Sequence, residues 1–128
     1  MTNRITLAPG VLALAALALA ACGGSAAPSP TPTPFGDPAA GKAAYVSTCV
    51  SCHGADAKGI EGLGKDLTTS EFLRTKTNEE MLTFLLTGRP AADPANTTGV
   101  DMPPKGGNPA LTETDLKNII AYLRTLQP

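Results

Sequence analysis

The stretch Cys49-Val50-Ser51-Cys52-His53 decides what this chain folds around. Two thiols separated by two residues and followed at once by an imidazole are the attachment pattern of a c-type haem. Each sulfur can bond to one vinyl group, and the two-residue gap lets one turn of chain reach both. His53 then lies under the iron, where its Nε2 can be an axial ligand. We therefore expect one covalent haem c, held by Cys49, Cys52 and His53.

Other uses of the two cysteines explain less of the pattern. A structural zinc site needs four ligands, and beyond carboxylates only Cys49, Cys52 and His53 are available. A thioredoxin-like redox pair would need a βαβ context, and the sequence shows no clear strands. A plain disulfide would leave the adjacent His53 unexplained.

Length and composition limit the class of protein. The chain has 128 residues, which fits one domain at most. Its formal net charge is −1, so it lacks the basic excess that nucleic-acid binding requires, and we expect no nucleic-acid partner. Three phenylalanines, two tyrosines and no tryptophan provide few large side chains for a core. A buried porphyrin would supply the missing apolar area.

Residues 1–21 are predicted to be a signal peptide. Arg4 is the one charge before an apolar run from Val11 to Ala21. That run is too short to span a bilayer and fits the apolar core of a signal peptide. The alternative is a short transmembrane anchor, which the length of the run disfavours.

A possible lipid attachment site follows the apolar run. The sequence Leu19-Ala20-Ala21-Cys22 resembles the bacterial lipobox, in which cleavage precedes a cysteine that becomes acylated. This accounts for the odd number of cysteines, because the chain has three and a haem uses two. We therefore expect Cys22 to be acylated and to hold the protein on the periplasmic, extracytoplasmic face of a bacterial membrane.

Residues 22–36 are predicted to be a spacer between the lipid and a folded domain. Small residues alternate with four prolines, at Pro28, Pro30, Pro32 and Pro34. Such a segment cannot bury enough surface to fold, and it favours an extended chain. At ~3.1 Å per residue it reaches roughly 45 Å, so a lipid-anchored domain could swing between partners.

Residues 37–128 show the caps and periodicity of short helices. Asp37 and Pro38 are a favoured N-cap and first helical position. A capping box begins at Thr77, and Gly88 is a natural helix stop. The last helix has an apolar stripe at Leu116, Ile119, Ile120 and Leu123. Helices are expected over 39–51, 70–74, 77–87 and 112–126, with a glycine-rich loop over 54–66 and a proline-rich loop over 90–109.

The second axial position of the iron has two candidate ligands in the chain. His53 is the only histidine, which excludes a second imidazole from this chain. Met81 lies among leucines on an amphipathic segment, where methionine is usually a core filler. Met102 lies in the irregular loop, and the prolines that follow it stiffen the backbone. We expect Met102 to be the ligand. Arg89 and Lys105 are conceivable neighbours of the haem propionates, but we interpret both as solvated surface charges.

From residue 37 to the C-terminus the sequence resembles a class I cytochrome c domain. The features shared are the motif at 49–53, the loop Met102-Pro103-Pro104 and a terminal helix carrying Ile120-Ala121-Tyr122-Leu123. The resemblance implies an all-α fold of three to five helices wrapped around one haem. It also implies a close crossing of the first and last helices, with Gly41 against Tyr122 and Tyr45 beside them. Many members have a proline whose carbonyl orients the axial histidine; this chain lacks it, so another carbonyl must serve.

The function that this resemblance implies is transfer of single electrons by a carrier that is not an enzyme. The expected partners are redox proteins or membrane electron-transport complexes, with no small-molecule substrate. One alternative is a fixed haem c subunit of a larger respiratory or photosynthetic membrane complex. A less favoured alternative is a haem peroxidase or gas sensor, which would need an open iron position and Met102 away from the iron.

Overall fold

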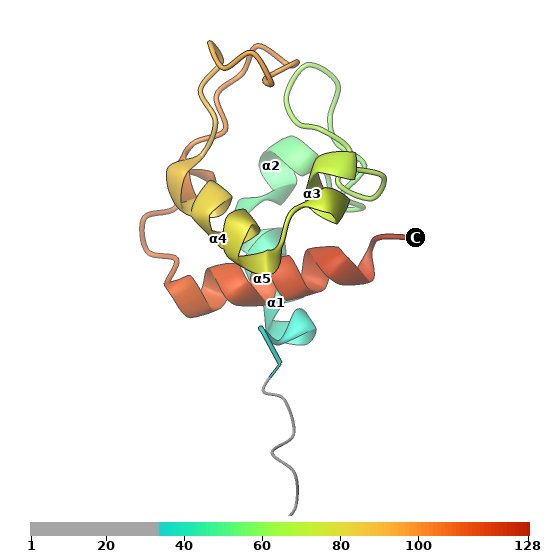
Figure 1. The fold of residues 1–128 in the computed structure, drawn as a ribbon, viewed down its shortest axis with the longest axis vertical. Helices are drawn as coiled ribbons and strands as arrows, with labels where there is room; N and C mark the ends of the chain where they lie inside the picture. Colours follow the sequence, from blue (N-terminus) through green and yellow to red (C-terminus); the bar gives the residue numbers. More distant parts are fainter. Residues whose placement is uncertain (1–33) are drawn as a thin grey trace, which may run out of the picture. The chain divides into compact units, whose positions relative to one another are not determined.

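The computed structural model describes residues 34–128 and contains no sheet within them. The all-α fold expected from the sequence is therefore confirmed. The predicted signal peptide over 1–21, Cys22 and most of the spacer over 22–36 lie outside the described residues. Within the described part, no helix is both long and apolar enough to cross a membrane. The elements in Figure 1 are α1 (Pro38–Thr48), α2 (Val50–His53), α3 (Glu71–Thr75), α4 (Asn78–Thr87), the 3₁₀ turn η1 (Pro104–Gly107) and α5 (Glu113–Thr125).

Helix α1 begins where its cap predicts and ends earlier than expected. The Asp37 carboxylate accepts hydrogen bonds from the backbone N–H groups of Ala39 and Ala40, at 2.8 and 3.4 Å. The expected single helix over 39–51 is interrupted at Cys49, and α2 follows as a separate short turn. Cys49 keeps right-handed helical dihedrals, so the chain continues in the same sense through the interruption.

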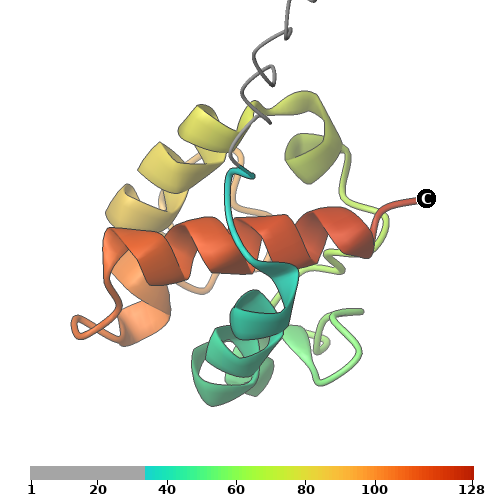
Figure 2. The same ribbon diagram turned by 90° about the horizontal axis from the view of Figure 1, so that it is seen from below.

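The first and last helices cross with their backbones in contact, as Figure 2 shows from below. A Cβ atom on Gly41 would lie 1.9 Å from the carbonyl oxygen of Asn118, so only glycine fits at this point. Tyr122 packs on Tyr45, with ring centroids 5.5 Å apart at an interplanar angle of 57°. The α5 atoms nearest to Gly41 belong to the backbone of Asn118 and Ile119.

One small apolar core lies beneath these elements. The α5 stripe expected from its periodicity is buried at all four positions, which confirms that prediction. Met81 is also buried, with 4% of its surface exposed, and belongs to the same core. The other buried apolar residues are Tyr45, Ala57, Leu73, Leu85 and Leu111.

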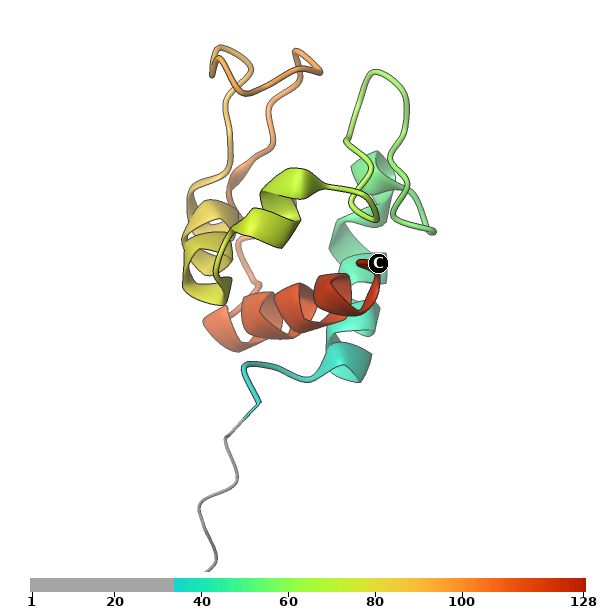
Figure 3. The same ribbon diagram turned by 45° about the vertical axis from the view of Figure 1, so that its right-hand side comes forward.

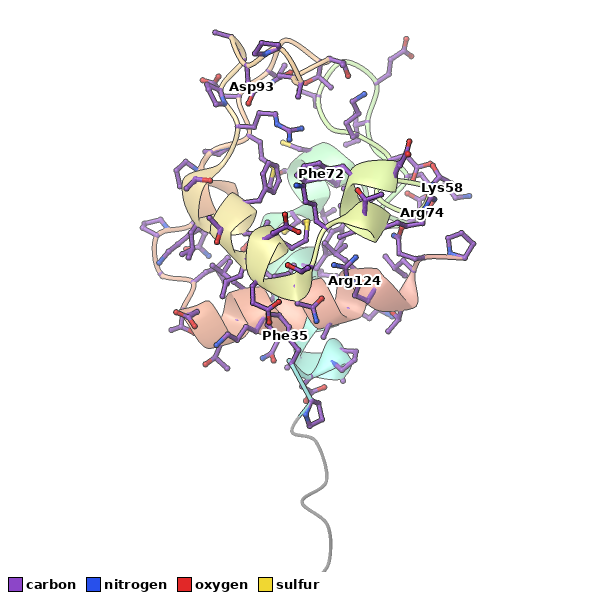
Figure 4. All side chains as sticks on the ribbon, viewed as in Figure 1. Phe35, Lys58, Phe72, Arg74, Asp93 and Arg124 are labelled. Carbon is purple, nitrogen blue, oxygen red and sulfur yellow. The ribbon has the colours of Figure 1, made fainter. Side chains whose placement is uncertain are left out.

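Arg124 fastens the segment between α3 and α4 to α5 (Figure 4). Its guanidinium donates to the side-chain oxygen of Asn78 at 3.1 Å and to the carbonyl oxygens of Lys76, at 2.6 Å, and Leu73. The planar guanidinium of Arg124 thus provides hydrogen-bond donors for backbone carbonyls of this segment. Beside it, α4 begins with the predicted capping box between Thr77 and Glu80.

The α1–α5 contact gives the first prediction. Replacing Gly41→Ala should lower the free energy of unfolding by about 1–3 kcal/mol, the usual cost of overpacking. The methyl group would have to displace backbone atoms rather than a flexible side chain. Chemical denaturation followed by far-ultraviolet circular dichroism measures the change.

The control for this variant is Ala43→Gly on the exposed side of the same helix. It should cost only about 1 kcal/mol through helix propensity. Because alanine is the better helix former, a Gly41→Ala protein as stable as the parent would contradict the backbone contact.

Candidate functional site

The expected site residues line one cavity of about 510 Å³. Its walls come from the end of α1 and α2, the chain around 63–72, the end of α4, and the loop that precedes η1. Figure 3 shows the loops over 54–66 and 90–101 extending from the same end of the helical part, with α3 between them. The structure brings together Cys49, Cys52, His53 and Met102 along this cavity.

His53 is oriented by a backbone carbonyl. Its Nδ1 lies 2.9 Å from the carbonyl oxygen of Lys65. A carbonyl can only accept, so Nδ1 carries the proton and Nε2 is left as the free lone pair that a metal requires. Lys65 thus supplies the carbonyl that the absent proline provides elsewhere, a role that the sequence did not assign to a residue.

Gly64 allows this carbonyl to approach. A Cβ atom at Gly64 would lie 2.3 Å from the carbonyl oxygen of Cys52 and 3.1 Å from Nδ1 of His53. The next residue but one, Asp66, accepts hydrogen bonds from the N–H and hydroxyl of Thr68 at 2.6 and 2.7 Å. Those bonds, led by the hydroxyl, hold the pKa of Asp66 below its usual value. The carboxylate therefore fixes the chain just after the carbonyl that binds His53.

Tyr45, a residue of the core, holds the turn that follows His53. The Tyr45 hydroxyl donates to the carbonyl oxygen of Gly54 at 2.7 Å. Gly54 has φ +77°, a conformation that suits glycine and turns the chain away from the cavity. Burial is the main cause that raises the pKa of Tyr45 above its usual value, so the phenol stays a neutral donor.

Both thiols of the motif are half-buried at the cavity wall. As a free thiol, Cys49 has its pKa raised to about 11, first by burial and then by the neighbouring Cys52. Reactive cysteines have a lowered pKa, so this environment does not suit a thioredoxin-like redox pair. Within residues 34–128, no group of three or more His, Cys, Asp or Glu side chains is placed to hold a metal ion, which leaves the zinc alternative without support.

Met102 is placed by a backbone bridge to the end of α4. The Arg89 N–H donates to the Met102 carbonyl at 2.7 Å, and the Met102 N–H donates to the Arg89 carbonyl at 2.8 Å. Gly88 has φ +71°, and a Cβ atom there would lie 2.2 Å from the Met102 carbonyl oxygen. Met102 lines the cavity, whereas Met81 lies in the core and does not.

Asn96 organises the proline-rich loop that carries Met102. Its side-chain amide donates to the carbonyls of Pro90 and Val100 at 3.1 and 2.7 Å. Its side-chain oxygen accepts from the N–H groups of Thr98 and Gly99 at 3.1 and 3.0 Å. The Asn96 side chain thus provides hydrogen-bond partners for backbone groups in both arms of the loop, which has no helix or strand to provide them.

The interpretation of Arg89 and Lys105 as solvated surface charges is wrong. The Arg89 side chain is 21% exposed, lines the cavity, and lies over the rings of Phe72 and Phe84. The Lys105 ammonium donates to the carbonyls of Pro109 and Leu111 at 3.3 and 2.8 Å. Sequence periodicity gave no signal for either contact, because the partners belong to different segments or are backbone atoms.

The hydroxyl of Tyr45 gives the second prediction. Tyr45→Phe should lower the free energy of unfolding by about 1–3 kcal/mol, because the Gly54 carbonyl loses its buried donor. Tyr122→Phe is the matched control, since it removes a hydroxyl from the partner ring without removing the bond to Gly54. Denaturant titration of the two variants measures the difference. Equal effects would show that the hydrogen bond to Gly54 adds no stability.

The comparisons with known proteins agree with this geometry. The family model for cytochrome c matches residues 38–127. Cytochrome c-555 of Chlorobaculum thiosulfatiphilum is 31% identical over 87 residues, which cover 68% of this chain and 93% of that protein. Cytochrome c-555 of Chlorobaculum tepidum is also 31% identical over 87 residues, covering 74% of its length.

A third relative is much longer than this chain. The Cbb3-type cytochrome c oxidase subunit CcoP of Rhodobacter capsulatus is 31% identical over 88 residues, or 68% of this chain, and the match spans only 28% of that subunit. No solved structure matches the chain significantly. The chain therefore belongs to the cytochrome c family of electron-transfer proteins, with one haem c attached covalently through Cys49 and Cys52.

Proposed function

We propose that this protein is a membrane-tethered monohaem c-type cytochrome that carries single electrons between redox partners. The observation that carries the proposal is the meeting of two distant segments at one cavity. Cys49, Cys52 and His53 reach it from the first half of the domain, and Met102 reaches it from the second. The proposed partners are redox proteins or membrane electron-transport complexes.

In this proposal His53 and Met102 would both bind the haem iron. The donor set fits the group, because an imidazole with a free Nε2 and a soft thioether line the same cavity as the two attachment cysteines. Haem c supplies a reversible one-electron couple at its iron. A thioether ligand in addition to histidine would favour the reduced state and raise the potential, which suits a carrier.

The protein's own contribution is to hold both ligands still and to keep water away. His53 is fixed through the Lys65 carbonyl, and Met102 is fixed through its two hydrogen bonds to Arg89. Apolar residues line the cavity, among them Leu67, Phe72 and Phe84. Ligands that are fixed before the electron arrives need little rearrangement when the charge changes, which favours fast transfer.

The relatives support both a free carrier and a fixed subunit. The chain spans nearly the whole of one cytochrome c-555, which supports a carrier. The similarity to an oxidase subunit supports the alternative, a haem domain fixed in a larger respiratory or photosynthetic complex. Extraction in mild detergent followed by size-exclusion chromatography separates the two, because a carrier elutes alone and a subunit elutes with its complex.

The tether is proposed from residues that precede the described domain. The lipobox-like sequence before Cys22 would place acyl chains on that cysteine, at the extracytoplasmic face of a bacterial membrane. Residues 22–36 would act as the spacer, and the haem domain would occupy 37–128. More than one acyl chain is needed for stable anchoring, because a single chain binds membranes only reversibly.

Ligation by Met102 gives the third prediction. The parent protein should show the sulfur-to-iron charge-transfer band, and Met102→Ala should lose it and shift to a lower midpoint potential. Met81→Leu is the matched control, because Met81 belongs to the core, and it should keep both properties. Absorption spectroscopy during a redox titration measures both. A parent protein without the band would exclude Met102 as the ligand and favour the open iron site of a peroxidase or gas sensor.

The lipid anchor gives the fourth prediction. Cys22→Ala should move the protein from the detergent phase to the aqueous phase in a phase-partition assay, because it removes the sulfur that would carry the lipid. Ser25→Ala, three residues further on, should remain in the detergent phase. Mass spectrometry of the mature protein gives a direct test, and an unmodified Cys22 would rule out the anchor.

A further inference from the structure

We propose that Arg89 sets the reduction potential of this site by keeping a positive charge inside the cavity wall. The inference rests on the proposed function, since it takes Met102 as a ligand of the iron. It assigns a specific electrostatic task to a side chain that the family motifs do not include.

The first observation is that the Arg89 guanidinium packs against two aromatic rings that touch each other. Its central carbon lies 4.7 Å from the ring centroid of Phe72 and 4.8 Å from that of Phe84. The two rings touch each other edge to face, with centroids 4.9 Å apart, so together they form one rigid aromatic surface for the guanidinium. Figure 4 labels Phe72 on α3, where its side chain is half-buried. Aromatic faces attract a cation that has lost much of its water.

The second observation is that this cation is only loosely neutralised. Its Nε lies 3.7 Å from Oδ2 of Asp93, too far for a hydrogen bond, and the Asp93 side chain is 37% exposed. The other oxygen of Asp93 accepts from the N–H of Ala95 at 2.7 Å. Arg124 differs, because its guanidinium donates to three oxygens of the described domain. Asp93 therefore only partly neutralises Arg89, and the acidic residues Asp66, Glu71 and Asp101 line the same cavity without a direct ion pair to it.

The third observation is that Arg89 is joined to Met102 through the backbone. Two hydrogen bonds, at 2.7 and 2.8 Å, pair these residues, and both side chains line the cavity. A positive charge in a poorly solvated wall repels ferric iron more than ferrous iron, because the ferric form carries one more positive charge. Arg89 should therefore favour the reduced state, and the negative charge of Asp93 should oppose it.

A purely structural role for Arg89 makes a different prediction. If Arg89 only packed against the two rings, its charge would not matter, and a lysine would be as disruptive as a neutral residue. If any positive charge on the domain had the same effect, the exposed Arg74 would serve as well. Arg74 donates to the Thr69 carbonyl and does not line the cavity.

The fifth prediction tests the charge directly, by redox titration of the mature haem-loaded protein. Arg89→Gln should shift the equilibrium about tenfold toward the ferric form, a fall of 59 mV for a one-electron couple. Arg89→Lys should keep most of the parent potential. Asp93→Asn should raise the potential, because it removes the opposing charge.

Arg74→Gln is the control for a surface charge. It should change the potential little, and the change should disappear as salt is added, because exposed charges are screened. The shift in Arg89→Gln should persist in the same salt. An unchanged potential in Arg89→Gln, or an equal fall in Arg89→Lys, would overturn the proposal.

The spectrum separates this inference from the proposed function. A parent protein without the sulfur-to-iron band means that the proposed ligation has failed, whatever Arg89 does. A variant that keeps the band and the parent potential without the Arg89 charge overturns the inference alone. If Arg89→Gln does not load haem, Asp93→Asn still decides, because a potential that stays constant or falls would contradict the electrostatic role.

Discussion

The contact between the backbone of α1 at Gly41 and that of α5 at Asn118 is the constraint on which the site depends. It fixes the rotation of α1, and with it the direction in which Tyr45 and Cys49 point, one and two turns later. Tyr45 then meets Tyr122 on α5 and holds the Gly54 carbonyl. The motif is therefore placed by the helix before it, which packs on α5, and by the turn after it, which Tyr45 holds.

The second half of the domain uses a different device to reach the same cavity. No helix carries Met102, so its position depends on hydrogen bonds to the end of α4 and on the internal bonds of Asn96. Gly88 permits the close backbone approach that a side chain at that position would block. An irregular loop can hold a ligand as firmly as a helix when its polar groups are satisfied in this way.

The features that the sequence predicted are those that depend on neighbours in the chain. The haem motif, the cap at Asp37, the capping box at Thr77 and the buried stripe of α5 are all local patterns, and the last three agree with the structure. Met102 lines the same cavity as His53, while its ligation of the iron stays a prediction. In each case the physical signal is spacing or a cap, and both are visible in a few consecutive residues.

The features that the sequence did not predict arise from contacts between distant segments. The carbonyl that binds His53 belongs to Lys65, and any residue type offers a carbonyl, so no side chain identifies it. The aromatic surface that contacts the Arg89 guanidinium combines Phe72 from α3 with Phe84 from α4, which do not share a helix face. The break at Cys49 likewise depends on packing, which local propensity does not encode.

The few aromatic residues are concentrated where the two proposed ligands are held. Of five in the chain, Tyr45 bonds the turn after His53 and pairs with Tyr122, and the pair Phe72 and Phe84 lines the same cavity as Met102. Aromatic pairs provide large contact areas with few rotatable bonds, so they stiffen a small domain efficiently. The same stiffness serves electron transfer, because a ligand that cannot relax keeps its geometry in both oxidation states. Because the chain has few large side chains, its core is small. The two aromatic pairs nevertheless keep the surroundings of the proposed haem site rigid.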